Sequence, residues 1–108
     1  MTDNEKKLSF DLAVEGSEAV MTVAGELDPH TADDLAGALD DLTSRDDISS
    51  VTLDLAEVSF IDSSGLRTIL TAHEALSSRD AQLTLRSPSE AVHRLLEITD
   101  LLEHLDVR

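Results

Sequence analysis

The side chains that could do chemistry gather in one stretch, FIDSSGLRTIL at 60–70. This stretch places the carboxylate of Asp62 and the adjacent hydroxyls of Ser63 and Ser64 directly before an apolar helical pattern. One interpretation is structural: one of these three residues caps the helix, and Gly65 permits close packing against a neighbour. The other is functional, because free N–H groups at the positive end of a helix dipole can receive a phosphate added to a serine. On local evidence alone the structural interpretation is favoured.

A hydrolase nucleophile is a third interpretation of a serine at a strand-to-helix turn. The G-x-S-x-G motif is absent, because Ile61 stands where its first glycine belongs. The sequence places no pair of a histidine and an acid to activate Ser63. We therefore predict that the chain is not an enzyme.

Metal and nucleotide chemistry have little support in the sequence. The four histidines are not paired at ligand spacing, and His73 falls on an apolar helical face, where a satisfied core or boundary imidazole is expected. A phosphate-binding G-x-x-x-x-G-K-[ST] loop is missing. We predict no catalytic residue, no metal site and no cofactor, while nucleotide binding by the domain stays open.

The net charge of the chain limits the classes of molecule that it can bind. Its 108 residues carry 23 Asp and Glu against 8 Lys and Arg, a formal net charge of −15. Such a charge repels nucleic acid and anionic membranes and leaves a basic protein surface as the natural partner. The sequence also lacks cysteine, an apolar signal-peptide core in its opening MTDNEKKLSF, and any segment of membrane-spanning length. We expect a soluble, cytoplasmic protein that binds neither nucleic acid nor membrane.

Hydrophobic periodicity predicts the elements that position these residues. Asp28 followed by Pro29 is a helix-start signal. The stretch SPSE at 87–90 predicts another start, with proline at the first helical position and a capping-box pair, Ser87 and Glu90. The predicted strands cover 8–14, 19–27, 50–55 and 82–86, and the predicted helices cover 29–45, 63–78 and a segment from 87 onward.

The order of these elements predicts an α/β fold. Strand–helix–strand steps demand parallel, right-handed crossovers, whereas the first two strands form an antiparallel hairpin. We predict one domain with a mixed four- to five-stranded sheet flanked by helices and a flexible N-terminus over 1–7. Segment 101–107 is ambiguous between a short strand and a frayed helical end. The side chains predicted to be buried are Leu53, Leu55, Leu66, Ile69, Leu83, Leu95 and Leu96.

Three stretches carry a resemblance to a known family. AGELDPHTADDL at 24–35 and VSFIDSSGLRTIL at 58–70 together closely resemble the STAS domain of bacterial anti-sigma factor antagonists, or anti-anti-sigma factors. SPSEAVHRLLEITDLLEHL at 87–105 resembles the last helix and final strand of that family. The similarity runs from Leu8 to Val107, and it implies a single STAS domain over 1–108.

The resemblance also implies a function. In such families the unphosphorylated antagonist binds an anti-sigma factor, often a serine kinase with a histidine-kinase-like ATPase fold, and so frees a sigma factor. The phosphorylated form lets go, and a phosphatase restores binding. The implied phosphorylation site is Ser63, directly after the motif aspartate. The implied partner-binding residues are Asp28, Asp62, Ser63, Ser64, Gly65 and Leu66. The alternative is a STAS subunit of another complex, of the lipid-transport or stressosome type.

Overall fold

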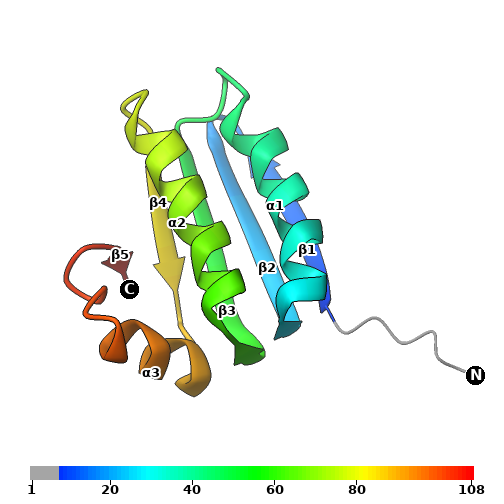
Figure 1. Ribbon diagram of the computed structural model, residues 1–108. Helices are drawn as coiled ribbons and strands as arrows, with labels where there is room; N and C mark the ends of the chain where they lie inside the picture. The colour runs from blue at the N-terminus through cyan, green and yellow to red at the C-terminus, as the bar shows by residue number, and fades with distance from the viewer. Residues whose placement is uncertain (1–7) are drawn as a thin grey trace, which may run out of the picture.

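Five strands form one mixed sheet in the computed structural model, which describes residues 8–108 (Figure 1). The predicted flexible N-terminus, 1–7, lies outside the described residues. The strands stand in chain order across the sheet, with β1 antiparallel to β2 and every other neighbouring pair parallel. The strands are β1 (Leu8–Glu15), β2 (Glu18–Leu27), β3 (Ser50–Ile61), β4 (Gln82–Arg86) and β5 (Asp106–Val107). The predicted mixed sheet is confirmed.

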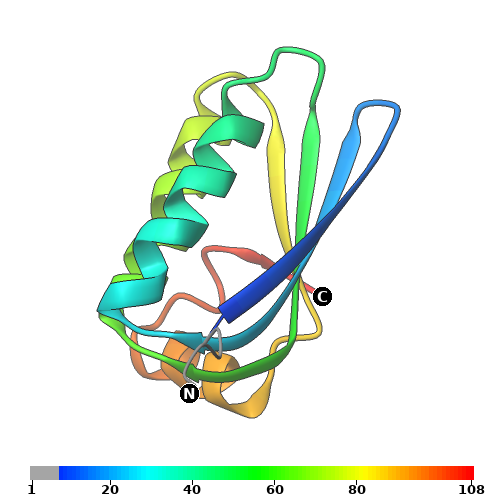
Figure 2. The same ribbon diagram turned by 90° about the vertical axis from the view of Figure 1, so that its right-hand side faces the viewer.

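Three helices accompany the sheet in the described part of the chain. They are α1 (Pro29–Thr43), α2 (Ser63–Ser77) and α3 (Glu90–Ile98). Helices α1 and α2 lie side by side on one face, as Figures 1 and 2 show, and α3 lies below them at one end of the sheet. The opposite face carries polar cross-strand pairs, such as the ion pair of Arg86 with Asp54 at 3.0 Å.

The hydrophobic core lies between the sheet and these two helices. Alternate residues of a strand point to the same face, so Leu53 and Leu55 of β3 are fully buried beneath the helices. Ile69 of α2 is also fully buried, and a side chain of this kind contributes about 1.5–3 kcal/mol by leaving water. Of the seven side chains predicted to be buried, only Leu95 remains partly exposed. The inward face of α3 is formed by Val92 and Leu96, which leaves Leu95 at its flank.

The start of α3 differs from the prediction. The N-cap is Ser89, whose hydroxyl oxygen accepts a hydrogen bond from Val92 N–H at 3.3 Å. Ser87 does not cap the helix, because it adopts a left-handed conformation with φ of 51°. Proline 88 therefore precedes the cap and does not occupy the first helical position. Segment 101–107, which was ambiguous in sequence, ends in the two residues of β5.

Strand β3 is longer than predicted. It continues past Leu55 to Ile61, because β2 pairs with it along its whole length and ends with Leu27 opposite Ile61. Strand β4 accompanies it only as far as Asp54. The extended end of β3 carries the chain to Asp62 and the start of α2.

Candidate functional site

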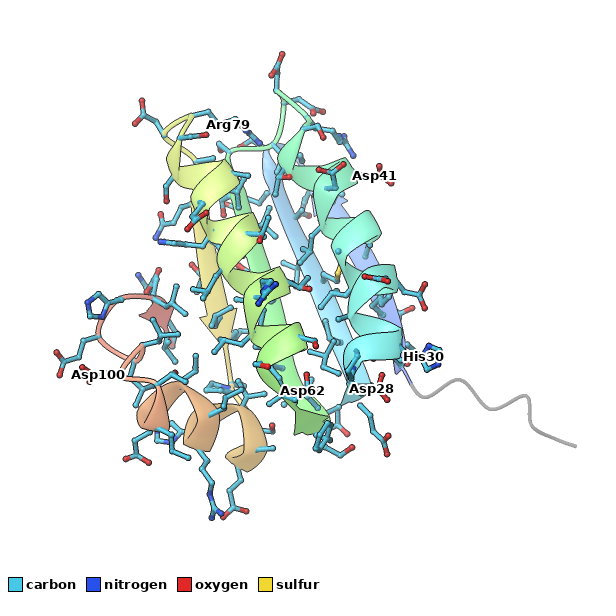
Figure 3. All side chains as sticks on the ribbon, viewed as in Figure 1. Asp28, His30, Asp41, Asp62, Arg79 and Asp100 are labelled. Atoms are coloured by element: carbon cyan, nitrogen blue, oxygen red, sulfur yellow. The ribbon has the colours of Figure 1, made fainter. Side chains whose placement is uncertain are left out.

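Two aspartates lie next to each other at the same end of the sheet. Because β2 and β3 are parallel and Leu27 pairs with Ile61, the residues that follow them, Asp28 and Asp62, begin α1 and α2 side by side. Asp62 N–H donates to the carbonyl of Leu27 at 3.2 Å, which joins the two turns. Figure 3 shows both aspartates at these neighbouring helix starts. The parallel pairing thus brings together two residues that are 34 positions apart.

Asp62 is the cap of α2. Its Oδ1 accepts hydrogen bonds from Ser64 N–H at 2.9 Å and Gly65 N–H at 3.4 Å, and its carbonyl accepts from Leu66 N–H at 3.1 Å. The structural interpretation of Asp62 is therefore confirmed. The expectation of several free N–H groups at this helix start is wrong, because only the N–H of Ser63 has no acceptor among the described residues.

Asp28 caps α1 together with Thr31, a hydroxyl-bearing residue that the sequence analysis did not single out. Its Oδ1 accepts from His30 N–H and Thr31 N–H, each at 2.9 Å. Asp28 N–H donates to the Thr31 hydroxyl at 3.0 Å, and that hydroxyl donates to the carbonyl of Glu26 at 2.6 Å. The signal in the sequence is D-x-x-T at 28–31, a capping box in which Thr replaces Glu or Gln.

The four residues after Asp62 differ in their exposure. Ser63 is exposed and Ser64 is half-buried, whereas Gly65 and Leu66 are buried. A Cβ added to Gly65 would lie 2.9 Å from Leu27 Cβ and 3.0 Å from the Cγ1 of Ile61. The predicted close packing at Gly65 is therefore confirmed. Because they are buried, Gly65 and Leu66 pack α2 against the sheet and thereby fix the position of Ser63 at the surface.

A cavity of about 260 Å³ lies between the first turns of α1 and α2. Ser63, Ser64 and Arg67 line it from α2, and Asp33 lines it from α1. Helix α1 itself carries four aspartates, DD at 33–34 and DD at 40–41, and no Lys or Arg. Only Asp33 of these four lines the cavity, so the carboxylates near Ser63 are those of Asp28, Asp33 and Asp62, and Arg67 is the positively charged residue of the cavity lining.

His73 and metal binding were also considered from the sequence, and His73 does not line the cavity beside Ser63. His73 is half-buried, and its Nδ1 is buried without a hydrogen-bond partner among residues 8–108, so it is not the satisfied imidazole that we expected. No group of three or more His, Asp or Glu side chains within those residues could hold a metal ion. None of the three described helices is long and apolar enough to cross a membrane.

Sequence relatives of the chain are named as antagonists of anti-sigma factors. The family model of the STAS domain matches residues 9–108. An anti-sigma-B factor antagonist of Listeria monocytogenes serovar 1/2a is 36% identical over 86 residues, which span 80% of this chain and 75% of the relative. An anti-sigma F factor antagonist of Paenibacillus polymyxa is 28% identical over 88 residues, spanning 82% of this chain and 75% of that protein.

Solved structures share the fold. The anti-sigma factor antagonist SpoIIAA in its unphosphorylated form has a TM-score of 0.79 and 22% identity, over 93% of this chain and 88% of SpoIIAA. The phosphorylated form of SpoIIAA, a Bacillus cell fate determinant, has a TM-score of 0.75 and 21% identity, over 93% of this chain and 91% of that structure. The chain therefore belongs to the STAS domain family, which includes these anti-sigma factor antagonists.

Proposed function

We propose that this protein is an anti-sigma factor antagonist controlled by phosphorylation of Ser63. Unphosphorylated, it binds an anti-sigma factor that is also a serine kinase of the ATPase type, and so makes a sigma factor available. Phosphorylation of Ser63 ends that binding, and a phosphatase restores it. The observation that carries this proposal is an exposed serine at the start of α2, directly after the capping Asp62, in a chain of this family.

Ser63 is a better acceptor of phosphate than Ser64 because its side chain is exposed. Ser64 is half-buried, and its N–H is held by the carboxylate of Asp62. In the transfer, the Ser63 hydroxyl oxygen forms a bond to the γ-phosphorus of ATP as the bond to ADP breaks, and the hydroxyl proton passes to a base of the kinase. The protein is then a substrate of its partner and needs no catalytic residue of its own.

A phosphate on Ser63 would weaken the complex mainly through charge. It adds about −1.5 to −2 charges to a chain whose net charge is already −15. Asp62 and Asp28 lie beside it, so a partner surface that fits the unphosphorylated acidic site would meet unbalanced charge and a desolvation cost. A loss of about 3 kcal/mol corresponds to a binding constant weaker by roughly a hundredfold.

The structure supports a switch that leaves the fold unchanged. The Ser63 side chain lies outside the core, and the cap of α2 is made by Asp62, not by the serine that is modified. The fold is also similar to both forms of SpoIIAA, unphosphorylated and phosphorylated. Binding and folding should therefore respond separately to a phosphate at this position.

The experiment uses the anti-sigma factor captured from native cells by the immobilised chain and then purified. With ATP, the wild type should gain one phosphate, and Ser63→Ala should gain none yet still bind. Ser63→Glu should bind at least tenfold more weakly while melting within a few degrees of the wild type. Ser64→Ala is the matched control and should gain phosphate as the wild type does. Phosphate on Ser64, or wild-type affinity of Ser63→Glu, would show that Ser63 is not the switch.

The alternative, a STAS subunit of a lipid-transport or stressosome-type complex, gives a different outcome in the same experiment. The captured partner would then be a transporter component or other STAS proteins, and it would not transfer phosphate to Ser63 or change its affinity when Ser63 is replaced by Glu. That result would replace the proposed function.

A further inference from the structure

Arg67 is the one positively charged residue among the described residues that line the cavity beside Ser63. It belongs to the first turns of α2, and it lines the same cavity of about 260 Å³ as Ser63 and Ser64. It also lines a second cavity, of about 490 Å³, that continues between α1 and α2. Its side chain is exposed, so it can change its rotamer without disturbing the core.

The guanidinium of Arg67 has no partner within residues 8–108. Carboxylates are abundant in this chain, and three other arginines form ion pairs with them. These pairs are Arg45 with Asp47 at 2.9 Å, Arg86 with Asp54 at 3.0 Å and Arg108 with Asp106 at 3.0 Å. Arg67 shares its cavity with Asp33, yet no ion pair joins the two. Arg67 therefore lines the cavity with a guanidinium whose five donors have no acceptor among the described residues.

The backbone of α2 offers little to an anion on Ser63. The N–H groups of Ser64 and Gly65 already donate to Asp62 Oδ1, and that of Leu66 donates to the Asp62 carbonyl. A phosphate on Ser63 thus competes with an existing cap for these donors. Of the first four N–H groups of α2, only that of Ser63 itself is free among the described residues, so any further hydrogen bonds to the phosphate must come from a side chain.

The position of Arg67 suits that role. It lies four residues after Ser63 on the same helix, and residues at this spacing are neighbours on the helix surface. Side chains of a helix lean toward its N-terminus, so the long Arg67 side chain extends toward Ser63. A guanidinium can donate two parallel hydrogen bonds to a phosphate.

We propose that Arg67 is the intramolecular binding partner of a phosphate on Ser63. This inference rests on the proposed function, since it requires that Ser63 is the modified residue. Arg67 holds the phosphate in the cavity between α1 and α2 and offsets the repulsion from Asp33 and Asp62, the carboxylates on either side of it. The phosphorylated state then keeps the Asp62 cap and remains as stable as the unmodified domain.

The experiment needs neither a kinase nor an anti-sigma factor. Phosphoserine is incorporated at position 63 during translation, and the phosphate is titrated by ³¹P NMR in the wild type, Arg67→Gln, Arg67→Lys and Arg94→Gln. The second pKa of phosphoserine is ordinarily about 6. Arg67→Gln should raise it by roughly half a unit relative to the wild type, as expected for an exposed ion pair. Arg67→Lys should lie between the two, because it keeps the charge but not the paired donors.

Arg94→Gln is the matched control. Arg94 is an exposed arginine of α3 that has no ion pair within the described residues, and it lines a different cavity. Its removal changes the net charge equally but should leave the phosphate pKa unchanged. A second readout is the Nε–H resonance of Arg67, which should shift when phosphoserine replaces Ser63 and exchange more slowly with water.

Two results would overturn the inference: an unchanged phosphate pKa in Arg67→Gln, or an equal rise in Arg94→Gln, which would reflect the general field of the protein. Both leave the proposed function intact. Conversely, undiminished binding of the phosphorylated chain to its anti-sigma factor would refute the proposed function without altering the Arg67 measurement.

Discussion

Replacing Gly65 by alanine tests whether the start of α2 is held in place by its close approach to the sheet. The added Cβ would lie 2.9 Å from Leu27 Cβ and 3.0 Å from Ile61 Cγ1, both below normal contact distance. Leu27 is fully buried, and its Cβ is fixed to the backbone of β2, so no rotamer change can relieve the overlap. Helix α2 must therefore move away from the sheet.

Two opposing terms set the size of the effect. Overpacking of this kind costs roughly 1–3 kcal/mol. The better helix propensity of alanine offsets about 1 kcal/mol of that cost, and less near a helix end than in its middle. We expect a net loss of about 1–2 kcal/mol in the free energy of unfolding, which lowers the Tm by roughly 4–8 °C for a domain of this size.

The assay is urea unfolding followed by far-UV circular dichroism, because the sequence contains neither Trp nor Tyr. Gly37→Ala on α1 is the matched control, since a Cβ there would meet nothing within 4 Å. That control should unfold at equal or higher urea concentration than the wild type, with a gain of at most about 1 kcal/mol. If Gly65→Ala is as stable as Gly37→Ala, the contact with Leu27 and Ile61 does not constrain α2, and our account of the site is wrong.

Two further predictions concern the caps and the pH dependence. Asp62→Ala removes both backbone hydrogen bonds of the α2 cap and should cost about 1 kcal/mol by calorimetry. Asp33→Ala, an exposed residue outside the cap, should stay within about 0.5 kcal/mol of the wild type, and equal losses in the two variants would contradict the role of the cap. Hydrogen bonds from Arg108 and then from Thr84 hold the pKa of Asp106 below its usual range. This stabilisation is present above the ordinary Asp pKa of about 3.9 and is lost as the pH falls through the lower folded value. In Arg108→Gln the urea midpoint should therefore decrease less steeply than in the wild type as the pH falls below about 4. An equally steep decrease in both proteins would show that Arg108 does not lower the pKa of Asp106.

The positions of both helix starts of the candidate site could be predicted from the sequence. Asp28 before Pro29, and Asp62 before an apolar helical pattern, are local signals, because the residue type itself supplies the capping oxygen. The start of α3 could not be predicted this way. SPSE offers two serines, and contacts from distant segments decide between them. Ser87 N–H donates to the carbonyl of Arg108, which holds Ser87 at the end of the sheet. Ser89 N–H donates to the carbonyl of Leu55, which holds Ser89 at the start of α3.

The rest of the site depends on tertiary structure. The sequence predicts a hydroxyl and a carboxylate at the start of α2, but it does not say which N–H groups the carboxylate uses. That choice follows from the conformation of Asp62, which occupies two donors and leaves only the N–H of Ser63 free among the described residues. The sequence likewise does not show that Arg67 and Asp33 line one cavity without forming an ion pair. The partial exposure of Leu95 depends on how α3 is rotated against the sheet.

The capping aspartates give the site both its rigidity and its charge. Asp62 orders the first turn of α2 and thereby fixes the backbone position of Ser63, while Asp28 does the same for α1 one strand away. The same two carboxylates make the local field negative, so a phosphate on Ser63 meets repulsion without any rearrangement of the fold. Under the function that we propose, such a site would change its affinity for a partner through added charge, with the core beneath it undisturbed. If Arg67 binds that phosphate as we propose, it would also set how much of the added charge a partner meets, because a phosphate bound to a guanidinium presents less of its charge outward than a phosphate left in water.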